Sequence, residues 1–333
     1  MTKINIPVSV LNLAPIREGE GAKEAIDAAV DLAQATERLG YKRYWIAEHH
    51  NTSNLVSSAT AILIKHVLEH TKEISIGSGG IMLPNHSPLV VAEQFGTMAT
   101  IYPGRVELGL GRAPGTDMLT ASALRRSQND SVYTFPNDVE SLLTYFGPEE
   151  VQTKVRAYPG MGTMVPIYIL GSSTDSAYLA ARLGLPYVFA SHFAPRHMDE
   201  AVKIYREKFQ PSQYLDKPYM IVCLNVIAAE SNEEAEFLST TMQQFFLNVV
   251  RSSQMKLQPP IESLAGNWSP MEVQMASSMT SVTLLGDKDS IRQQLTRFQE
   301  RYNVDEIMAV SYIYDQDKQI RSYEILKQVV EGK

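Results

Sequence analysis

Three consecutive residues, Glu48, His49 and His50, carry groups that can move protons or contact a cofactor. They end an apolar run within the stretch RYWIAEHHN at 43–51. A histidine with a pKa near 6.5 can donate and accept protons at neutral pH. The structural alternative is that Glu48 caps a local element and the histidines belong to a surface loop. Adjacent strand residues point to opposite faces, so we expect no metal site at His49-His50.

Glycine, serine and arginine residues follow other apolar segments, and each group has two interpretations. Gly79-Gly80 can form an ordinary turn, or it can leave bare backbone against which a flat ligand lies. Arg112 can belong to a structural ion pair, or its guanidinium can hold a phosphate. Gly171, Ser172 and Ser173 stand before a predicted helix. They can bind an anion, because free amides and the helix dipole favour one at a helix start, or they can simply cap the helix.

The elements that must position these residues are strands that alternate with helices. Helices are expected over most of the connections, for example at 24–39, 88–101 and 175–183. The candidate residues, with His192, follow the second to the sixth strands, and a barrel brings such strand ends to one face. The sequence therefore predicts an α/β fold, a (β/α)8 TIM barrel. Its eight strands are expected at 4–13, 44–47, 74–78, 106–110, 166–170, 187–190, 219–229 and 306–311.

Length and composition limit the class of protein. The chain has 333 residues, of which 44% are hydrophobic, enough for a large core. A net charge of −7 argues against nucleic acid or an anionic membrane as the main partner. We expect one domain over 1–333, with irregular insertions at about 113–165 and 252–285.

The single cysteine, Cys223, lies in an apolar run and is expected to be buried and unreactive. The amino-terminal residues lack the features of a signal peptide, and no apolar run approaches membrane-spanning length. We therefore expect a cytoplasmic enzyme that does not act at a membrane.

Four colinear motifs carry a resemblance to a known family. They are AEHHN at 47–51, GSGGIMLPNHSP at 77–88, GR…GLGRAPG at 104–115 and LGSS at 170–173. Together they resemble the bacterial luciferase-like flavin monooxygenase superfamily, and most closely its single-chain group 1 oxidoreductases. The resemblance covers nearly the whole chain, and it is specific for the family but not for the substrate.

The resemblance implies a barrel that binds FMN at its carboxyl face. His49 matches the histidine that supports flavin oxygenation and is the expected catalytic residue. Gly79-Gly80 matches backbone beneath the isoalloxazine, often with a non-prolyl cis peptide, and Arg112 and Ser172 match positions around the phosphate. The expected cofactor-binding residues are Glu48, Gly79, Gly80, Arg112, Gly171, Ser172, Ser173 and His192.

The implied reaction is that of an FMN-dependent monooxygenase. Reduced FMN and O2 form a flavin hydroperoxide, which oxygenates a small organic substrate. Two departures argue against light emission: Gly111 stands where luciferase has a reactive cysteine, and Ala190-Ser191-His192 stands where luciferase has tryptophans.

Partners and rival functions follow from the same resemblance. The sequence has no nicotinamide motif, so a separate NAD(P)H flavin reductase is the expected source of reduced FMN. A homodimer is expected through apolar helices that begin near Ser57 and Pro88. The rivals are a deazaflavin-dependent oxidoreductase that transfers hydride, a non-catalytic flavin-binding protein, and a metal-dependent barrel hydrolase.

Overall fold

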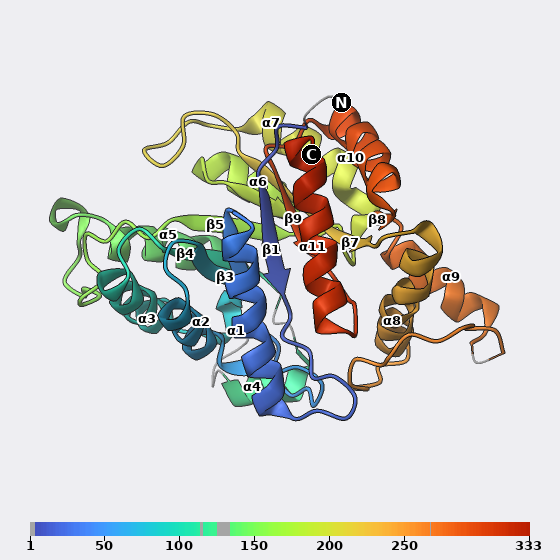
Figure 1. Ribbon diagram of the computed structural model, residues 1–333. Coiled ribbons are helices and arrows are strands. Elements are labelled where there is room, and N and C mark those ends of the chain that lie inside the picture. Colours follow the sequence, from blue (N-terminus) through green and yellow to red (C-terminus); the bar gives the residue numbers. More distant parts are fainter. Residues whose placement is uncertain (1–3, 114–115, 125–133, 267) are drawn as a thin grey trace.

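Eight parallel strands form a closed barrel in the computed structural model, which describes residues 4–113, 116–124, 134–266 and 268–333 (Figure 1). Strands pair in the order β6-β5-β4-β3-β2-β1-β9-β7, and pairing of β6 with β7 closes the ring. The expected (β/α)8 TIM barrel is therefore confirmed. The barrel strands are β1 (Val8–Asn12), β2 (Arg43–Ile46), β3 (Ser75–Met82), β4 (Val106–Gly111), β5 (Ile167–Gly171), β6 (Tyr187–Phe189), β7 (Met220–Ala228) and β9 (Glu306–Val310).

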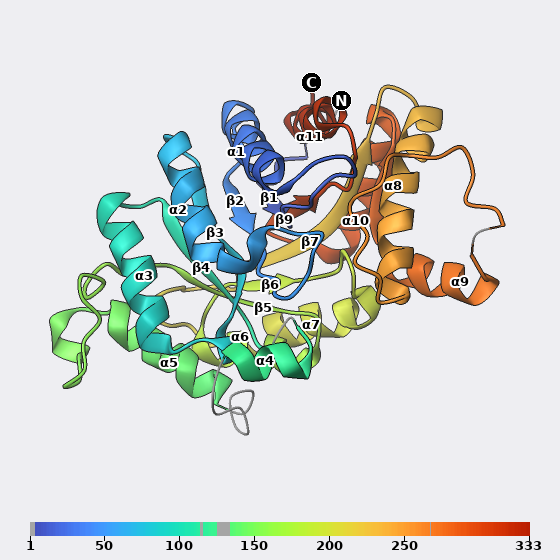
Figure 2. The same cartoon turned by 90° about the horizontal axis from the view of Figure 1, so that it is seen from below.

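Helices surround the barrel, as the view from below in Figure 2 shows. The β1 arrow in Figure 1 points toward α4, so the carboxyl ends of the strands open on that side. We call this end the mouth and the opposite end the base. The helices are α1 (Ala22–Arg38), α2 (Thr60–His70), α3 (Pro88–Ile101), α4 (Met118–Leu124), α5 (Phe135–Phe146), α6 (Thr174–Leu183), α7 (Met198–Lys208), α8 (Asn232–Val250), α9 (Pro270–Met279), α10 (Lys288–Tyr302) and α11 (Gln316–Glu331).

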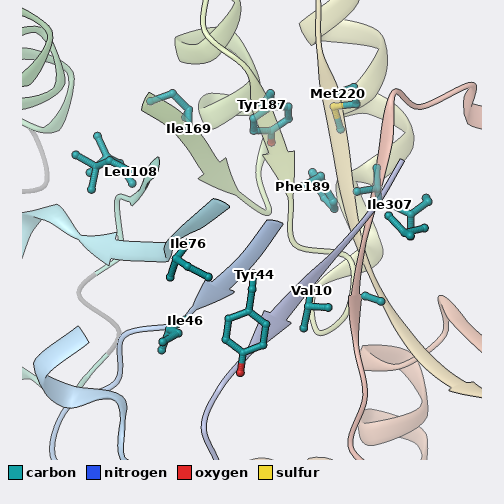
Figure 3. Packing of buried hydrophobic residues seen from close by; sticks show 14 of the residues in the cluster. Val10, Tyr44, Ile46, Ile76, Leu108, Ile169, Tyr187, Phe189, Met220 and Ile307 are labelled. Atoms are coloured by element: carbon teal, nitrogen blue, oxygen red, sulfur yellow. The ribbon is translucent and has the colours of Figure 1, made fainter. Parts of the chain in front are cut away.

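Strand β2 shows how the two-residue repeat of a strand divides the core. Tyr44 and Ile46 belong to the apolar layer between strands and helices, part of which Figure 3 shows. Trp45 lies inside the barrel, where its ring packs edge-on against Tyr168 at 4.9 Å. Successive side chains of a strand point to opposite faces, so the order of residues decides which side chains enter the barrel.

The two expected insertions are more regular than the sequence analysis suggested. The described part of 113–165 contains α4 and α5, and 252–285 contains α9 and an additional strand, β8 (Thr283–Gly286), which pairs with the carboxyl half of β7. The sequence analysis also omitted α7, although the buried Ala201, Ile204 and Tyr205 recur at helical spacing. Among the described residues, no helix is both long and apolar enough to cross a bilayer.

Candidate active site

The mouth of the barrel brings the ends of β2 and β3 together, because the two strands pair in parallel through Ile46 and Ser78. Glu48, two residues beyond β2, is fully buried. Its Oε1 lies 2.8 Å from the Nε2 atoms of both His50 and His86. Its Oε2 accepts a hydrogen bond from the backbone N–H of Met82 at 3.2 Å. One carboxylate thus joins the ends of both strands.

The surroundings of Glu48 keep its carboxylate ionised. Burial alone would raise the pKa of Glu48, but hydrogen bonds from His50, His86 and the Met82 amide lower it to about 2. The ligand atoms of Glu48, His50 and His86 lie within 4.8 Å of one another, so this group can also hold a metal ion. The sequence analysis expected no metal at His49-His50 and did not single out His86, which follows β3 in the same motif as Gly79-Gly80.

His49 and His192 form a different environment at the same mouth. Burial lowers the pKa of His49, and burial together with the nearby His49 lowers the pKa of His192 to about 3. Both imidazoles are therefore neutral at pH 7. In each ring the Nδ1 atom is buried and has no hydrogen-bond partner among the described residues. Buried polar atoms are normally paired, so these two nitrogens mark a place where a ligand or water belongs.

Residues beside His192 continue the polar lining. Asn225 in β7 donates from Nδ2 to the backbone oxygen of His192 at 2.6 Å, while its own Oδ1 is buried and unpaired among the described residues. The sequence analysis missed Asn225. The signal was present: it is the only amide within the long apolar run of β7.

Gly79 and Gly80 lie within β3, where its register with β4 shifts. The peptide bond between them is cis. A Cβ on Gly79 would meet Leu11 Cδ1 at 2.5 Å, and a Cβ on Gly80 would meet the Gly109 backbone oxygen at 2.8 Å. The backbone of β4 therefore favours glycine at position 80 whether or not a ligand also lies there, whereas a side chain at position 79 would first have to displace the Leu11 side chain.

Arg112 follows β4 and lies at the amino-terminal end of α6. Its Nη1 and Nη2 are each 3.2 Å from Oδ2 of Asp175, in the first turn of that helix. The Arg112 and Asp175 side chains are 42% and 68% exposed, so water weakens the pair and its effect on stability is small. Both interpretations of Arg112 thus remain: it forms an ion pair, and it is accessible to an anion.

The turn between β5 and α6 contains the other expected anion-binding residues. Ser173 is the N-cap residue of α6, but its side chain makes no capping hydrogen bond. A Cβ on Gly171 would meet Ser176 Oγ at 2.0 Å, so glycine is needed for the helix to start this close to the strand. Uncapped backbone N–H groups, with the hydroxyls of Ser172 and Ser173 and the Arg112 guanidinium, make a suitable phosphate site.

Both insertions attach to the loop that follows His50. Asn51 donates from Nδ2 to Asp117 Oδ2 at 3.2 Å, and Gln254 donates from Nε2 to the Asn51 backbone oxygen at 2.9 Å. Asp117 directly precedes α4, and Gln254 precedes α9. The segments outside the barrel thus border the part of the mouth that carries His49. Pro114 and Gly115, at the end of the GLGRAPG motif, lie outside the described residues.

Comparison with known proteins identifies the family. Residues 6–303 match the family described as luciferase-like monooxygenase. The chain belongs to this family. An Escherichia coli K12 protein named luciferase-like monooxygenase is 47% identical over 331 residues, 99% of each chain. The N-acetyl-S-alkylcysteine monooxygenase of Bacillus subtilis is 30% identical over 334 residues, 98% of each chain. The suspected family is confirmed, and its members are oxidoreductases.

Solved structures agree with this family and its fold. A structure described as apo-MsnO8 has a TM-score of 0.87, 31% identity and 98% coverage of each chain. The oxygenating constituent of 3,6-diketocamphane monooxygenase from Pseudomonas putida, in complex with FMN, has a TM-score of 0.73 at 17% identity, covering 99% of this chain and 98% of that one. An F420-dependent secondary alcohol dehydrogenase has a TM-score of 0.69 at 15% identity, covering 98% and 99%. The last two likenesses concern the fold alone.

Proposed function

We propose that this protein is an FMN-dependent monooxygenase that uses reduced FMN and O2 to oxygenate a small organic substrate. One observation carries the proposal: neutral His49, whose buried Nδ1 has no partner among the residues that the structure describes, shares the barrel mouth with the start of α6, which has no side-chain cap among those residues and lies beside Arg112. The first group can exchange a proton with a reacting atom, and the second can hold a phosphate. A flavin mononucleotide has a ring system and a phosphate that suit these two groups.

The donor set fits FMN residue by residue. Arg112, Ser172, Ser173 and the first amides of α6 would hold the phosphate, with Gly171 allowing the close turn. His192 and the backbone of Gly79-Gly80 would contact the ring system. Bound reduced FMN would supply the electrons for O2 activation. The chain contributes binding, orientation and exclusion of water, which is the usual division of labour in cofactor enzymes.

His49 is the residue we assign to proton transfer. Burial keeps its imidazole neutral, so one ring nitrogen can accept a proton and the other can donate one. His192 stays neutral to much lower pH and therefore serves as a fixed hydrogen-bonding group. Glu48 supports His49 from the neighbouring position in the chain.

Two relatives guide the choice of probes. The Bacillus subtilis relative is named as a monooxygenase of N-acetyl-S-alkylcysteines, and one structural neighbour was solved with FMN. A thioether of that class is therefore the first substrate to test. A separate flavin reductase supplying reduced FMN stays part of the proposal.

The test is reconstitution with FMN, riboflavin and a deazaflavin, followed by anaerobic reduction and mixing with O2 in the presence of an N-acetyl-S-alkylcysteine. We expect FMN to bind most tightly of the three cofactors. In a panel of thioethers and ketones that includes the N-acetyl-S-alkylcysteine, we expect one oxygen atom of labelled O2 to enter an organic product. Hydride transfer with the deazaflavin in the absence of O2 would contradict the proposal. So would FMN binding without any turnover across the panel, which fits a non-catalytic flavin-binding protein.

We also propose a homodimer through α2 and α3, which lie next to each other (Figure 1). Their outer faces expose Ile62, Val90 and Ile101 by 70%, 45% and 54%. Side chains of this size exposed on neighbouring helices favour burial against a second copy. Light scattering at micromolar concentration should give twice the chain mass, and Ile62→Glu should shift it toward the monomer. The single-domain organisation and the cytoplasmic location remain predictions.

A further inference from the structure

The proposed function uses His49 but leaves two neighbouring histidines without a role. His50 and His86 both point their Nε2 atoms at one oxygen of Glu48, at 2.8 Å each. Their side chains are 12% and 28% exposed, whereas that of Glu48 is 1% exposed. A buried carboxylate held by two imidazoles from different strand ends is a built arrangement, and it stands directly before His49 in the chain.

The carboxylate decides where the protons of both histidines reside. An ionised carboxylate has no hydrogen to donate, so each Nε2 atom that bonds to it must carry one. The neutral forms of His50 and His86 are therefore both the Nε2–H tautomer, which leaves Nδ1 as an acceptor. The Met82 amide is a third donor to this carboxylate, at Oε2.

The cluster of Glu48, His50 and His86 connects two segments whose relative position matters for the proposed function. They are the residues that follow β2 and the strand β3. Glu48 and His50 flank His49 after β2, while Met82 ends β3, the strand that contains Gly79-Gly80. His86 follows the 3-10 turn Leu83–Asn85 at the end of β3. The Glu48 contacts thus fix the backbone on both sides of His49 and join it to the glycine strand.

A bound metal ion would require a different spacing. Nitrogen and oxygen ligands lie about 2.0–2.1 Å from zinc, and the tetrahedral arrangement that zinc prefers places two such ligands about 3.3–3.4 Å apart. The observed separations of 2.8 Å from Glu48 Oε1 to each Nε2 are ordinary hydrogen-bond lengths. The geometry therefore favours hydrogen bonds over a metal.

We propose that His86 is a positioning residue, which, through the Glu48 carboxylate that it shares with His50, sets the place of the His49 ring relative to Gly79-Gly80. The role in oxygenation rests on the proposed function, but the hydrogen-bonding arrangement does not. Displacement of a reacting group by about 1 Å can lower a rate by about 10²-fold, so a residue that only positions His49 can have a large effect.

The first experiment needs no cofactor. Long-range proton–nitrogen NMR of the 15N-histidine-labelled protein at pH 7 reports the tautomer of each imidazole. We expect the Nε2–H tautomer for His50 and His86, and loss of this preference in Glu48→Gln. An Nδ1–H tautomer at His86 would overturn the proposal, as would a stoichiometric metal ion in the purified protein that is lost in His86→Leu.

The second experiment uses matched variants at position 86. His86→Gln retains an N–H donor that can reach Glu48, whereas His86→Leu cannot donate. We expect His86→Leu to move the His49 ring resonances and to change the rate of reoxidation of bound reduced FMN by O2 by on the order of 10-fold or more. His86→Gln should stay within about threefold of the wild type, and so should His197→Gln, a control at an exposed histidine.

The outcomes separate this proposal from the proposed function. If FMN does not bind, the proposed function fails, while the NMR result still decides the arrangement around Glu48. If His86→Leu binds FMN and leaves the His49 resonances and the reoxidation rate unchanged, the positioning role is wrong. Equal effects of His86→Gln and His86→Leu would also contradict it, because the hydrogen bond would then not be the cause.

Discussion

The two ends of β2 carry two buried ionic clusters of different kinds. At the base, Arg43 lies between two carboxylates, with Nη1 3.1 Å from Glu107 Oε2 and Nε 2.9 Å from Glu306 Oε1. At the mouth, Glu48 lies between two imidazoles, His50 and His86. One cluster thus surrounds a cation with anions, and the other surrounds an anion with titratable groups.

The base cluster has a fixed positive charge and well-paired carboxylate oxygens. Burial would lower the pKa of Arg43, but Glu107 and Glu306 raise it, so its guanidinium stays charged. Hydrogen bonds from neighbouring side chains occupy both carboxylates. They come from Trp45 and Tyr168 to Glu107, and from Ser9 and Tyr219 to Glu306. Each carboxylate oxygen of Glu107 and Glu306 thus has at least one partner within the protein.

The mouth combines a closed cluster with open positions. Glu48 has three hydrogen-bonding partners, but the Nδ1 atoms of His49 and His192 beside it have none within the described part of the chain, and Arg112 is half exposed. The comparison supports the proposal that the base of this barrel contributes stability and the mouth contributes chemistry, the division known from TIM-barrel enzymes. Substitutions at the two ends should therefore separate unfolding from activity.

The largest expected effect is at the base. Arg43→Met leaves Glu107 buried without its cation and leaves Glu306 with the half-exposed Lys42, 3.4 Å from its Oε2, which should lower the free energy of unfolding by about 3–5 kcal/mol. The matched control is Arg301→Met, because Arg301 and Asp199 form a surface pair that is 64% and 62% exposed; it should lose under about 1 kcal/mol. Urea unfolding followed by circular dichroism measures both. If Arg43→Met does not fold, Arg43→Lys, which keeps the charge, is measured in its place. Equal losses of unfolding free energy at Arg43 and at Arg301 would contradict the stabilising role of the base.

The base cluster also marks the limit of what the sequence could predict. All eight barrel strands were located from apolar segments and turn residues, since period and punctuation are local features. The ion pairs of Arg43 join residues 64 and 263 positions apart, and only the closed barrel brings them together. A charged residue inside a strand does not reveal its partner.

The sequence likewise predicted only part of the candidate site. Strand ends placed His49, Arg112 and His192 at one mouth, because the fold fixes where strands end. His86 was missed because it lies beyond a turn after β3, and its contact with Glu48 depends on the course of that turn. Asn225 was missed because its apolar neighbours masked it.

At the mouth, His49→Ala should leave folding intact and remove oxygenation. Loss of a general acid–base residue typically lowers a rate by about 10²–10⁴-fold, and the electrons should then appear as hydrogen peroxide. O2 uptake, peroxide yield and labelled product are measured together, with circular dichroism as the check on folding. His50→Ala should do less, because His50 bonds to Glu48 instead of meeting the reacting atoms. Unchanged coupling in His49→Ala would make this residue structural and would weaken the division between base and mouth.

The buried His192 should make stability depend on pH. Its folded-state pKa of about 3 is below the ordinary value of 6.5, so the unfolded chain binds the proton more readily. The contribution of His192 to the free energy of unfolding is therefore fully present above pH 6.5 and is lost as the pH falls from 6.5 toward 3. The loss amounts to about 2 kcal/mol by pH 5. His192→Asn should flatten the curve of unfolding free energy against pH in this window, while His197→Asn at an exposed position should not. An unchanged slope in His192→Asn would mean that His192 is solvated in solution.

The smallest expected effect on stability is at Arg112. Its pair with Asp175 at the mouth is the counterpart of the Arg43 cluster at the base. Arg112 and Asp175 are largely exposed, so Arg112→Ala should change the free energy of unfolding by under about 1 kcal/mol. It should weaken FMN by roughly tenfold, the loss of one charge-assisted hydrogen bond, and leave riboflavin nearly unaffected, because only FMN carries a phosphate. Flavin fluorescence titrations of the wild type, Arg112→Ala and Arg112→Lys measure this, and the lysine variant should retain part of the preference for FMN. Equal losses of affinity for both flavins would show that the phosphate does not bind at α6. A loss of stability like that of Arg43→Met would show that Arg112 is a structural residue.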